Sequence, residues 1–290
     1  MKDLKKFINF LENKLCEILN DPIKIINVGD MSKSPYILQS QSSSFFIKTL
    51  SVNEVEIFEA ERDGLQELSL NSIINTPKCY LVDTFEDLSF IVLEKLDFYE
   101  GNDKDWFLMG EQLARLHRMK QNYFGWHRIN TIGLSKQFNT KNGNWIDFYR
   151  EERLKIQFDM AEKNGLKLSE KKCLLSEFPK LFINHEVYPS ILHGDLWGGN
   201  AAFVSKNNPI LFDPACYYGD REVDIAMTEL FGGFPPGFYK GYESVLPLNS
   251  GYKKRKDLYN LYHILNHYNI FGVGYELQVK EIVGKICNYL

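Results

Sequence analysis

The stretch from Ile191 to Ala215 reads ILHGDLWGGNAAFVSKNNPILFDPA, and the spacing of its polar residues decides the fold class. Asp195 stands five residues before Asn200 and 18 residues before Asp213. These intervals separate the base, a metal-binding amide and a metal-binding carboxylate in the catalytic segment of phosphoryl-transfer kinases. The His-Gly-Asp prefix and the flanking apolar runs make the match more specific than a lone Asp-x4-Asn. The stretch therefore predicts a kinase-like catalytic segment.

Each of the three residues has a chemical role that suits its type. Asp195 lies between a β-like run and a glycine-rich turn, where its carboxylate could accept a hydroxyl proton. Asn200 and Asp213 offer hard oxygen donors of the kind that Mg²⁺ prefers. The structural alternatives are that Asp195 caps turn amides and that Asp213 ends a strand before Pro214.

A lysine and a glutamate upstream complete the predicted nucleotide site. Lys48 ends the β-like run Phe45–Lys48, and Glu61 follows 13 residues later on a helical pattern. In kinases such a lysine positions the phosphates and is held by a helix carboxylate. The same helix offers rival carboxylates, Glu54, Glu56 and Glu59, and a solvated lysine on a charged helix face is the alternative.

The nucleotide-covering turn is predicted at residues 28–35, with Gly29 and Ser32 near the phosphates. It holds one glycine, so it matches neither the Walker pattern nor Gly-x-Gly-x-x-Gly. Asp30 would oppose phosphate charge, and Lys33 could offset it. Residues 94–96 form a connector, where the backbones of Glu94 and Leu96 are predicted to contact adenine.

Three further polar residues are interpreted as supports. His193 precedes the predicted base by two residues and is expected to brace the loop by hydrogen bonding. His117 closes a helical pattern and is interpreted as structural. Asp224 begins another helix, where it could cap the helix, anchor the catalytic loop, or do both.

Composition excludes several classes of protein. With 34 basic and 38 acidic residues the net charge is −4, so there is no broad basic surface for nucleic acid. The short basic cluster at residues 253–256 is interpreted as a solvated helix start. Five scattered cysteines form no Cys-x-x-Cys pair, and no 18-residue apolar run occurs, so we expect a reduced, cytoplasmic, non-membrane protein.

The periodicity of the chain predicts an α+β fold of two lobes. A helix over residues 4–19, strands over 23–28, 36–39, 44–50, 77–82 and 89–93 and a helix over 54–70 predict a small antiparallel-sheet lobe, residues 1–95. Residues 96–290 then read as a mainly helical lobe, with helices over 106–118, 145–164 and 171–184. This is the lobe order of protein-kinase-like folds.

Longer strings of sequence resemble a known family. The strings HGDLWGGN (193–200), FDPACYYGDREVD (212–224), GEQLARLH (110–117) and GYESVLPL (241–248) are similar to those of the fructosamine kinase (ketosamine-3-kinase) family. That family belongs to the aminoglycoside-phosphotransferase and choline-kinase superfamily. The matches run in family order along nearly the whole chain.

The resemblance implies an activity and assigns roles. It implies ATP- and Mg²⁺-dependent phosphorylation of a ketosamine at the C3 hydroxyl, after which the product would release the amine. Asp195 would be the base, Asn200 and Asp213 the magnesium ligands, and Lys48 with Glu61 the phosphate-positioning pair. Trp197 would stack on a sugar, although it could instead pack to shape its turn. Further substrate-side polar groups would be Asp220, Arg221 and Glu222.

The chain departs from the family in the nucleotide turn, where Asp30 replaces a second glycine and Pro35 replaces a small residue. Two other functions stay open, and the altered turn is the reason for the second of them. One is a kinase for another hydroxylated amine, such as an aminoglycoside or a choline-like compound. The other is an inactive nucleotide-binding scaffold. The sequence does not distinguish a monomer from a homodimer.

Overall fold

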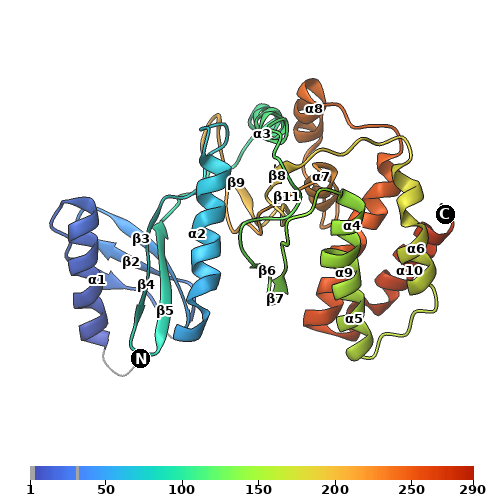
Figure 1. Cartoon of the computed structure of the whole chain (residues 1–290). Helices are drawn as coiled ribbons and strands as arrows, with labels where there is room; N and C mark the ends of the chain where they lie inside the picture. The colour runs from blue at the N-terminus through green and yellow to red at the C-terminus, as the bar shows by residue number, and fades with distance from the viewer. Residues whose placement is uncertain (1–3, 31–32) are drawn as a thin grey trace.

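The computed structural model describes residues 4–30 and 33–290, and its N-terminal part is an antiparallel sheet with a helix on each face (Figure 1). The five strands follow the order β1-β2-β3-β5-β4. Their bounds are β1 Ile25–Val28, β2 Tyr36–Ser40, β3 Ser44–Ser51, β4 Cys79–Phe85 and β5 Leu88–Glu94. Helix α1 (Leu4–Leu19) precedes the sheet, and α2 (Val55–Ser69) follows the 3-10 turn Val52–Glu54 between β3 and β4.

The alternation of apolar residues explains why the sheet has a helix on each face. Phe7, Leu11 and Leu15 of α1 are fully buried against one face, which includes Phe45 and Phe90. On the other face the apolar side of α2 packs against Ile91 and Leu93 of β5. Each such buried side chain contributes about 1.5–3 kcal/mol. The sheet therefore fixes α2, the helix that carries Glu61, on the side of the C-terminal part.

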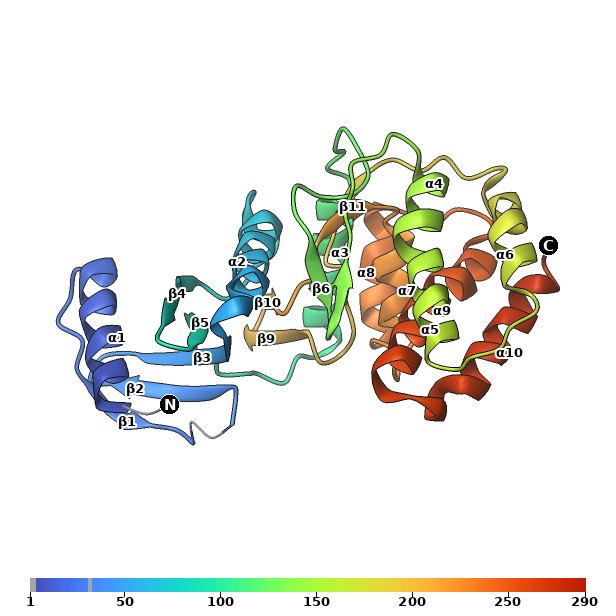
Figure 2. The ribbon, with the colours of Figure 1, turned by 60° about the horizontal axis from the view of Figure 1, so that its bottom comes forward.

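The C-terminal part is mainly helical and has three small hairpins or strand pairs (Figure 2). Its helices are α3 Asp103–His117, α4 Trp145–Tyr149, α5 Ile156–Lys163, α6 Lys171–Glu177, α7 Glu222–Thr228, α8 Pro236–Val245, α9 Tyr252–Phe271 and α10 Glu276–Cys287. A π-helical segment, Arg150–Lys155, joins α4 to α5, and 3-10 turns lie at Phe178–Phe182 and Val273–Tyr275. Its strands are β6 Asn130–Ile132, β7 Ser135–Gln137, β8 Ser190–Leu192, β9 Ala201–Ser205, β10 Asn208–Leu211 and β11 Tyr217–Gly219.

Helix α9 is the centre of this part. Every residue from Leu258 to Asn266 is buried, because α5, α7 and α10 pack around the helix (Figure 2). A helix that is buried all round carries little amphipathic signal. The sequence therefore indicates a helix here but not which of its faces contact a cavity.

The predicted fold class is confirmed, with differences in detail. The helix predicted over residues 145–164 is a continuous run of α, π and α segments. The β6–β7 hairpin was not predicted, because strands of three residues show too little alternation. The sheet ends at Glu94 and α3 begins at Asp103, and the division at residues 95/96 stays a prediction within this connection.

Two further findings concern membranes and cysteines. Among the residues that the structure describes, no helix combines the length and apolar character that crossing a bilayer would need. All five cysteines are free thiols.

Candidate active site

The catalytic loop, residues 193–200, directly follows β8. Strand β8 pairs with β11, which comes after the segment that carries Asp213. Tyr217 lies opposite Leu192 in this antiparallel pair, so the chain turns sharply at Gly194. Gly194 has a φ of +81°, and a Cβ there would lie 2.1 Å from the Ala215 carbonyl oxygen. Only glycine fits this turn, and it directs the chain so that Asp195 faces a cavity.

Hydrogen bonds of Asp224 and His193 hold this loop in place. The Asp224 carboxylate accepts hydrogen bonds from the backbone amides of His193 and Gly194. His193 Nε2 donates to the Phe212 carbonyl at 3.0 Å. His117 bridges Asp224 and the Tyr242 hydroxyl, as expected of a structural residue. Of the two roles open to Asp224, the structure shows loop anchoring and no side-chain cap on α7.

Asn200 and Asp213 come together beside Asp195. Asn200 Nδ2 donates to the backbone and side-chain oxygens of Asp195, at 2.9 and 3.2 Å, which leaves the amide oxygen of Asn200 for another partner. Asp213 has a φ of +55°, an uncommon conformation for a residue other than glycine. The Ala215 amide donates to the His193 carbonyl at 2.8 Å and holds this turn against the catalytic loop.

Burial changes the acidity of the predicted base. Removal of Asp195 from water raises its pKa to about 7, and the charges of Asp213 and Asp224 add to this rise. The hydrogen bond from Asn200 works in the opposite direction. Asp195 is therefore poised to exchange a proton near neutral pH.

Lys48 reaches the same cavity from β3. Its Nζ lies 2.8 Å from Glu61 Oε1 and also pairs with Asp213. Burial alone would lower the pKa of Lys48, but the two carboxylates outweigh it and raise the pKa, so the lysine stays protonated. Of the rival carboxylates Glu59 pairs with Arg128 instead. The predicted Lys48–Glu61 pair is thus present.

Three cavities lie end to end along these residues. The central cavity, about 320 Å³, is lined by Lys48, Glu61, Asn200, Asp213 and Asp195. Asp213 also lines the hinge cavity, about 330 Å³, with Phe46, Leu93, Glu94, Leu96, Phe98 and Phe212. Asp195 and Trp197 also line the α9 cavity, about 390 Å³, with Phe231, His263, His267, Phe271 and Tyr275. The order is therefore hinge cavity, central cavity, α9 cavity.

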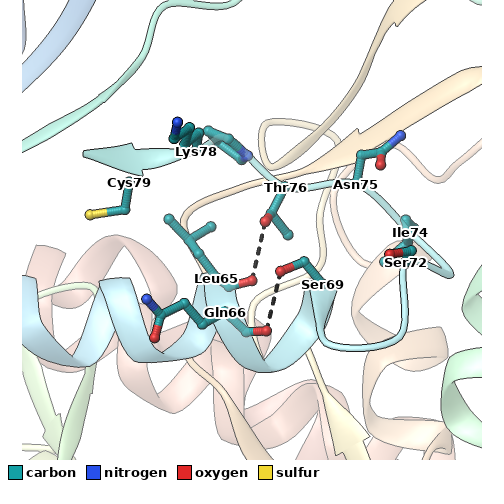
Figure 3. A pocket seen from close by; sticks show the side chains of 10 residues that line it. Leu65, Gln66, Ser69, Ser72, Ile74, Asn75, Thr76, Lys78 and Cys79 are labelled. Atoms are coloured by element: carbon teal, nitrogen blue, oxygen red, sulfur yellow. Dashed lines mark hydrogen bonds between the residues drawn. The ribbon is translucent and has the colours of Figure 1, made fainter. Parts of the chain in front are cut away.

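A separate cavity of about 350 Å³ lies at the end of α2 (Figure 3). Two of its polar side chains are engaged within the chain: Thr76 Oγ1 donates to the Leu65 carbonyl at 3.1 Å and Ser69 Oγ to the Gln66 carbonyl at 3.2 Å. None of the predicted site residues lines it. We therefore assign no part of the active site to it.

The nucleotide turn differs in part from its prediction. The Gly29 amide donates to the Ile37 carbonyl at 2.8 Å, so it is committed to the β1–β2 hairpin and not to a phosphate. Ser32 lies outside the described residues. Lys33 Nζ lies 3.7 Å from Asp30, in line with the expected offset of charge. The Glu94 amide donates to the Lys78 carbonyl, and both Glu94 and Leu96 line the hinge cavity.

The structure does not bring the predicted substrate groups Asp220, Arg221 and Glu222 to any of the three cavities. Asp220 accepts hydrogen bonds from His185 and Tyr259, at 2.7 and 2.6 Å. Arg221 donates to the Leu246 and Pro247 carbonyls. All three side chains are buried. Their interpretation as substrate contacts is corrected to a buried polar network.

The surroundings of Glu222 explain why it was wrongly predicted to contact the substrate. Its carboxylate forms a two-pronged pair with Arg255, with Nε–Oε2 and Nη2–Oε1 distances of 2.7 and 2.9 Å. Arg255 belongs to the basic cluster that was interpreted as solvated, yet it is buried. A run of charged residues in a sequence usually lies on the solvent-exposed surface. The burial of Glu222 becomes evident only when the fold brings Arg255 against it.

Trp197 packs in its turn, which was one of its two expected roles, and its stacking on a sugar stays a prediction. Its indole lies against Gly199, where a Cβ would come within 2.4 Å of the ring, so the residue shapes its turn. The side chain is nevertheless 40% exposed and lines both the central and the α9 cavity. Sequence reasoning missed the aromatic residues of the α9 cavity, because those on α9 have the spacing of a core helix face and Phe231 and Tyr275 lie in separate segments.

Comparisons with known proteins agree with this geometry. The model of the fructosamine kinase family matches residues 4–289. The probable ketoamine kinase of Vibrio parahaemolyticus is 43% identical over 263 residues, which cover 90% of this chain and 91% of that protein. The protein-ribulosamine 3-kinase of Arabidopsis thaliana is 38% identical, covering 84% of this chain and 76% of the plant protein.

Solved structures show the same relationship. A crystal structure assigned as a fructosamine-3-kinase from Haemophilus somnus superposes with a TM-score of 0.88 at 28% identity, covering 95% of this chain and 96% of that one. The choline kinase of Streptococcus pneumoniae shares the fold, with a TM-score of 0.63 at 13% identity, and covers 98% of this chain and all of its own. The chain is a member of the fructosamine kinase family, with the protein-kinase-like fold of the aminoglycoside phosphotransferases and choline kinases.

Proposed function

We propose that this chain transfers the γ-phosphoryl group of ATP to the C3 hydroxyl of a ketosamine. The observation that carries the proposal is the sequence of three joined cavities, with Asp213 at one junction and Asp195 at the other. The order matches that of the adenine ring, the phosphates and the acceptor in a phosphoryl-transfer complex. Family membership and the names of its relatives, ketoamine kinases and a ribulosamine 3-kinase, support the acceptor class.

The hinge cavity suits the adenine ring. Phe46 and Leu93 of the sheet line one side, and Phe98 stacks on Phe212 with their ring centroids 5.6 Å apart. The described residues contain no intramolecular hydrogen-bond partner for the Leu96 amide, so this N–H is available to a ring nitrogen. Apolar walls with a backbone donor are typical of a nucleobase site.

Asn200 and Asp213 fit a magnesium ion by their chemistry. Both offer hard oxygen atoms to the central cavity, and Mg²⁺ is bound in such sites by one or two protein ligands together with phosphate oxygens. When bound, the ion neutralises charge on the phosphates. The Lys48 ammonium, held by Glu61, adds a second positive group at the same place.

Asp195 acts on the acceptor. Its carboxylate accepts the proton of the attacking hydroxyl while that oxygen forms a bond to the γ-phosphorus. The bond from phosphorus to the bridging oxygen breaks, and ADP leaves. The Asp224 hydrogen bonds keep the loop in place, and Asn200 holds the side chain of Asp195 toward the cavity.

A kinase assay over a panel of acceptors tests this function. The panel contains fructosyl-lysine and ribulosyl-lysine, with choline and an aminoglycoside as other hydroxylated amines. We expect ADP release with the ketosamines and a phosphate on C3 of the product by ³¹P–¹H NMR. Turnover of choline or the aminoglycoside alone would establish the other kinase, and absence of turnover with bound ATP would establish a scaffold. Cytoplasmic location and oligomeric state stay predictions.

A further inference from the structure

The α9 cavity has a continuous wall of aromatic rings that begins beside the base. Trp197 lies 6.4 Å from Phe231 between ring centroids, and Phe231 lies 4.9 Å from His267. His267 in turn lies 5.5 Å from Phe271 and 5.1 Å from Tyr275. The rings come from the catalytic loop, the segment after α7, and the end of α9 with its following turn. Separate elements thus converge on one wall.

The charges around this cavity have one sign. Its lining in the described part of the chain contains one carboxylate, Asp195, and neither lysine nor arginine. His267 Nδ1 is committed to the His263 carbonyl at 2.8 Å, which requires a proton on that nitrogen and leaves Nε2 as the other polar atom of the ring. A cation in this cavity would meet ring faces and a carboxylate.

The wall also opens to solvent. Phe271 is 66% exposed, and Val273, in the turn that follows, is 74% exposed. Phe231 and Tyr275 are half-buried between this rim and the interior. The α9 cavity adjoins the central cavity and opens to solvent at its other end, so it has room for a group that extends out of the site.

We propose that Phe231, Phe271 and Tyr275 bind the substituted ammonium of the acceptor and so determine its specificity for amines. The inference rests on the proposed function, in which the amine stands on C1 of a sugar whose C3 hydroxyl faces Asp195. Three bonded carbons separate this nitrogen from the hydroxyl oxygen, so an acceptor that reaches Asp195 from the α9 cavity keeps its nitrogen in that cavity. Aromatic faces attract cations, most strongly where water is partly excluded.

Binding of a matched pair of ligands tests the proposal. Fructosyl-propylamine carries a secondary ammonium, and 1-O-propyl-fructose has an ether oxygen at the same position. Isothermal titration measures both on the full chain, as wild type and as the variants Phe231→Leu and Phe271→Leu. Leucine keeps apolar bulk and removes the ring. Phe107→Leu, an exposed position on α3 outside the α9 cavity, is the matched control.

We expect the wild type to prefer the ammonium ligand. Each cavity variant should weaken ammonium binding by about 2- to 30-fold, the range of one cation–π contact, and ether binding by less than about twofold. The control should change neither. Asp195 is intact in every variant, so its charge does not contribute to the difference.

Two results would overturn the inference: equal affinity of the wild type for both ligands, or equal losses for both in the variants. The second would mean that the rings provide apolar packing alone. Because titration does not require phosphoryl transfer, the two proposals fail separately. If the ring variants lose ammonium binding more than ether binding and the wild type shows no turnover, the kinase function is removed and the ammonium site is kept. Turnover with equal losses for both ligands would do the reverse.

Discussion

The carboxylate of Asp224 accepts hydrogen bonds from two consecutive backbone amides, those of His193 at 2.7 Å and Gly194 at 2.9 Å. A third donor, His117 Nε2, lies 3.2 Å away. Asp224 is fully buried, yet these donors outweigh its burial and hold its pKa below the usual range. One side chain of α7 therefore fixes the loop that presents Asp195.

Asp224→Ala should destabilise the fold and reduce turnover together. Removing the acceptor leaves three buried donors unpaired, which costs about 3–5 kcal/mol in the free energy of unfolding. The loss should be largest at neutral pH and shrink below about pH 4, where the unfolded-state carboxyl protonates. Urea unfolding at several pH values measures it, with the exposed Asp21→Asn as control. A loss that does not depend on pH would contradict the charged role.

The acidity of Asp195 predicts the pH dependence of activity. Because burial raises its pKa to about 7, kcat/KM should fall about tenfold per pH unit below that value. Asp195→Asn should reduce kcat by about 10²–10⁴-fold. Steady-state kinetics from pH 5 to pH 9 measure both. A variant that keeps wild-type kcat would remove the base assignment.

The buried Asp195 carboxylate should make the wild type less stable than Asp195→Asn above about pH 7. Its folded-state pKa lies above the unfolded value, so the folded state holds a proton that the unfolded state has released. Stability therefore falls as pH rises from about 4 to about 7, by up to about 1.4 kcal/mol per unit, and then stays level. The Asn variant lacks this slope. Thermal melts at pH 5 and pH 8 should show a larger gain of the variant relative to the wild type at pH 8 than at pH 5.

Glu61→Gln tests the positioning of Lys48. Loss of the charge removes the partner 2.8 Å from Nζ and leaves Lys48 with Asp213, a predicted magnesium ligand. A charge-assisted hydrogen bond contributes about 1.5–3 kcal/mol, so kcat/KM for ATP should fall about 10- to 100-fold. The exposed Glu56→Gln on the same helix is the control. Equal effects at both positions would assign the loss to α2 as a whole.

Arg128 connects α2 to the C-terminal part. Its Nη2 lies 2.8 Å from Glu59, and its Nη1 pairs with Asp63. Both pairs are partly exposed, so Arg128→Gln should cost about 0.2–1 kcal/mol per pair, and less at high salt. Because α2 carries Glu61, the KM of the Arg128→Gln variant for ATP should be higher than that of the wild type at low ionic strength. The control is Arg115→Gln, whose pair with Glu111 is longer, at 3.9 Å.

Glu222→Gln separates a structural role from a substrate role. It leaves the buried Arg255 without its carboxylate, which should cost about 3–5 kcal/mol in stability. The KM for the acceptor should change less than twofold in the fraction that stays folded. Melting temperature and acceptor kinetics measure the two effects, with the exposed Lys253→Gln as control. A rise in acceptor KM without a loss of stability would restore the substrate interpretation.

Much of the site could be predicted because its geometry is local. Asp195, Asn200 and the Gly194 turn lie within one short loop, and Asp213 ends the next hairpin, so their spacing along the chain nearly fixes their spacing in space. Lys48 and Glu61 are joined by a strand and the helix that follows it. Alternation and helical periodicity place these two elements.

The remainder depends on partners that are distant in sequence. Asp220, Arg221 and Glu222 have the composition of a polar surface, but all three are buried. Tyr259 and Arg255 of α9 bond to Asp220 and Glu222, and Arg221 bonds to the Leu246 and Pro247 carbonyls. The rings of the α9 cavity come partly from α9, where His267 and Phe271 have the spacing of a core helix face, and partly from separate segments. Nothing local indicates that Phe271 faces an opening. The amide of Gly29 is committed to a hairpin partner on β2.

The sequence by itself determined the fold class and the family, and it predicted which residues carry phosphoryl transfer, because strand and helix periods and short-loop spacings are local properties. Only the tertiary structure decided which polar groups face solvent, which rings line the α9 cavity, and that burial raises the pKa of Asp195 to about 7. Burial is the reason. It depends on what the rest of the chain packs against a residue, and it sets both the cost of a charge and the shape of a cavity.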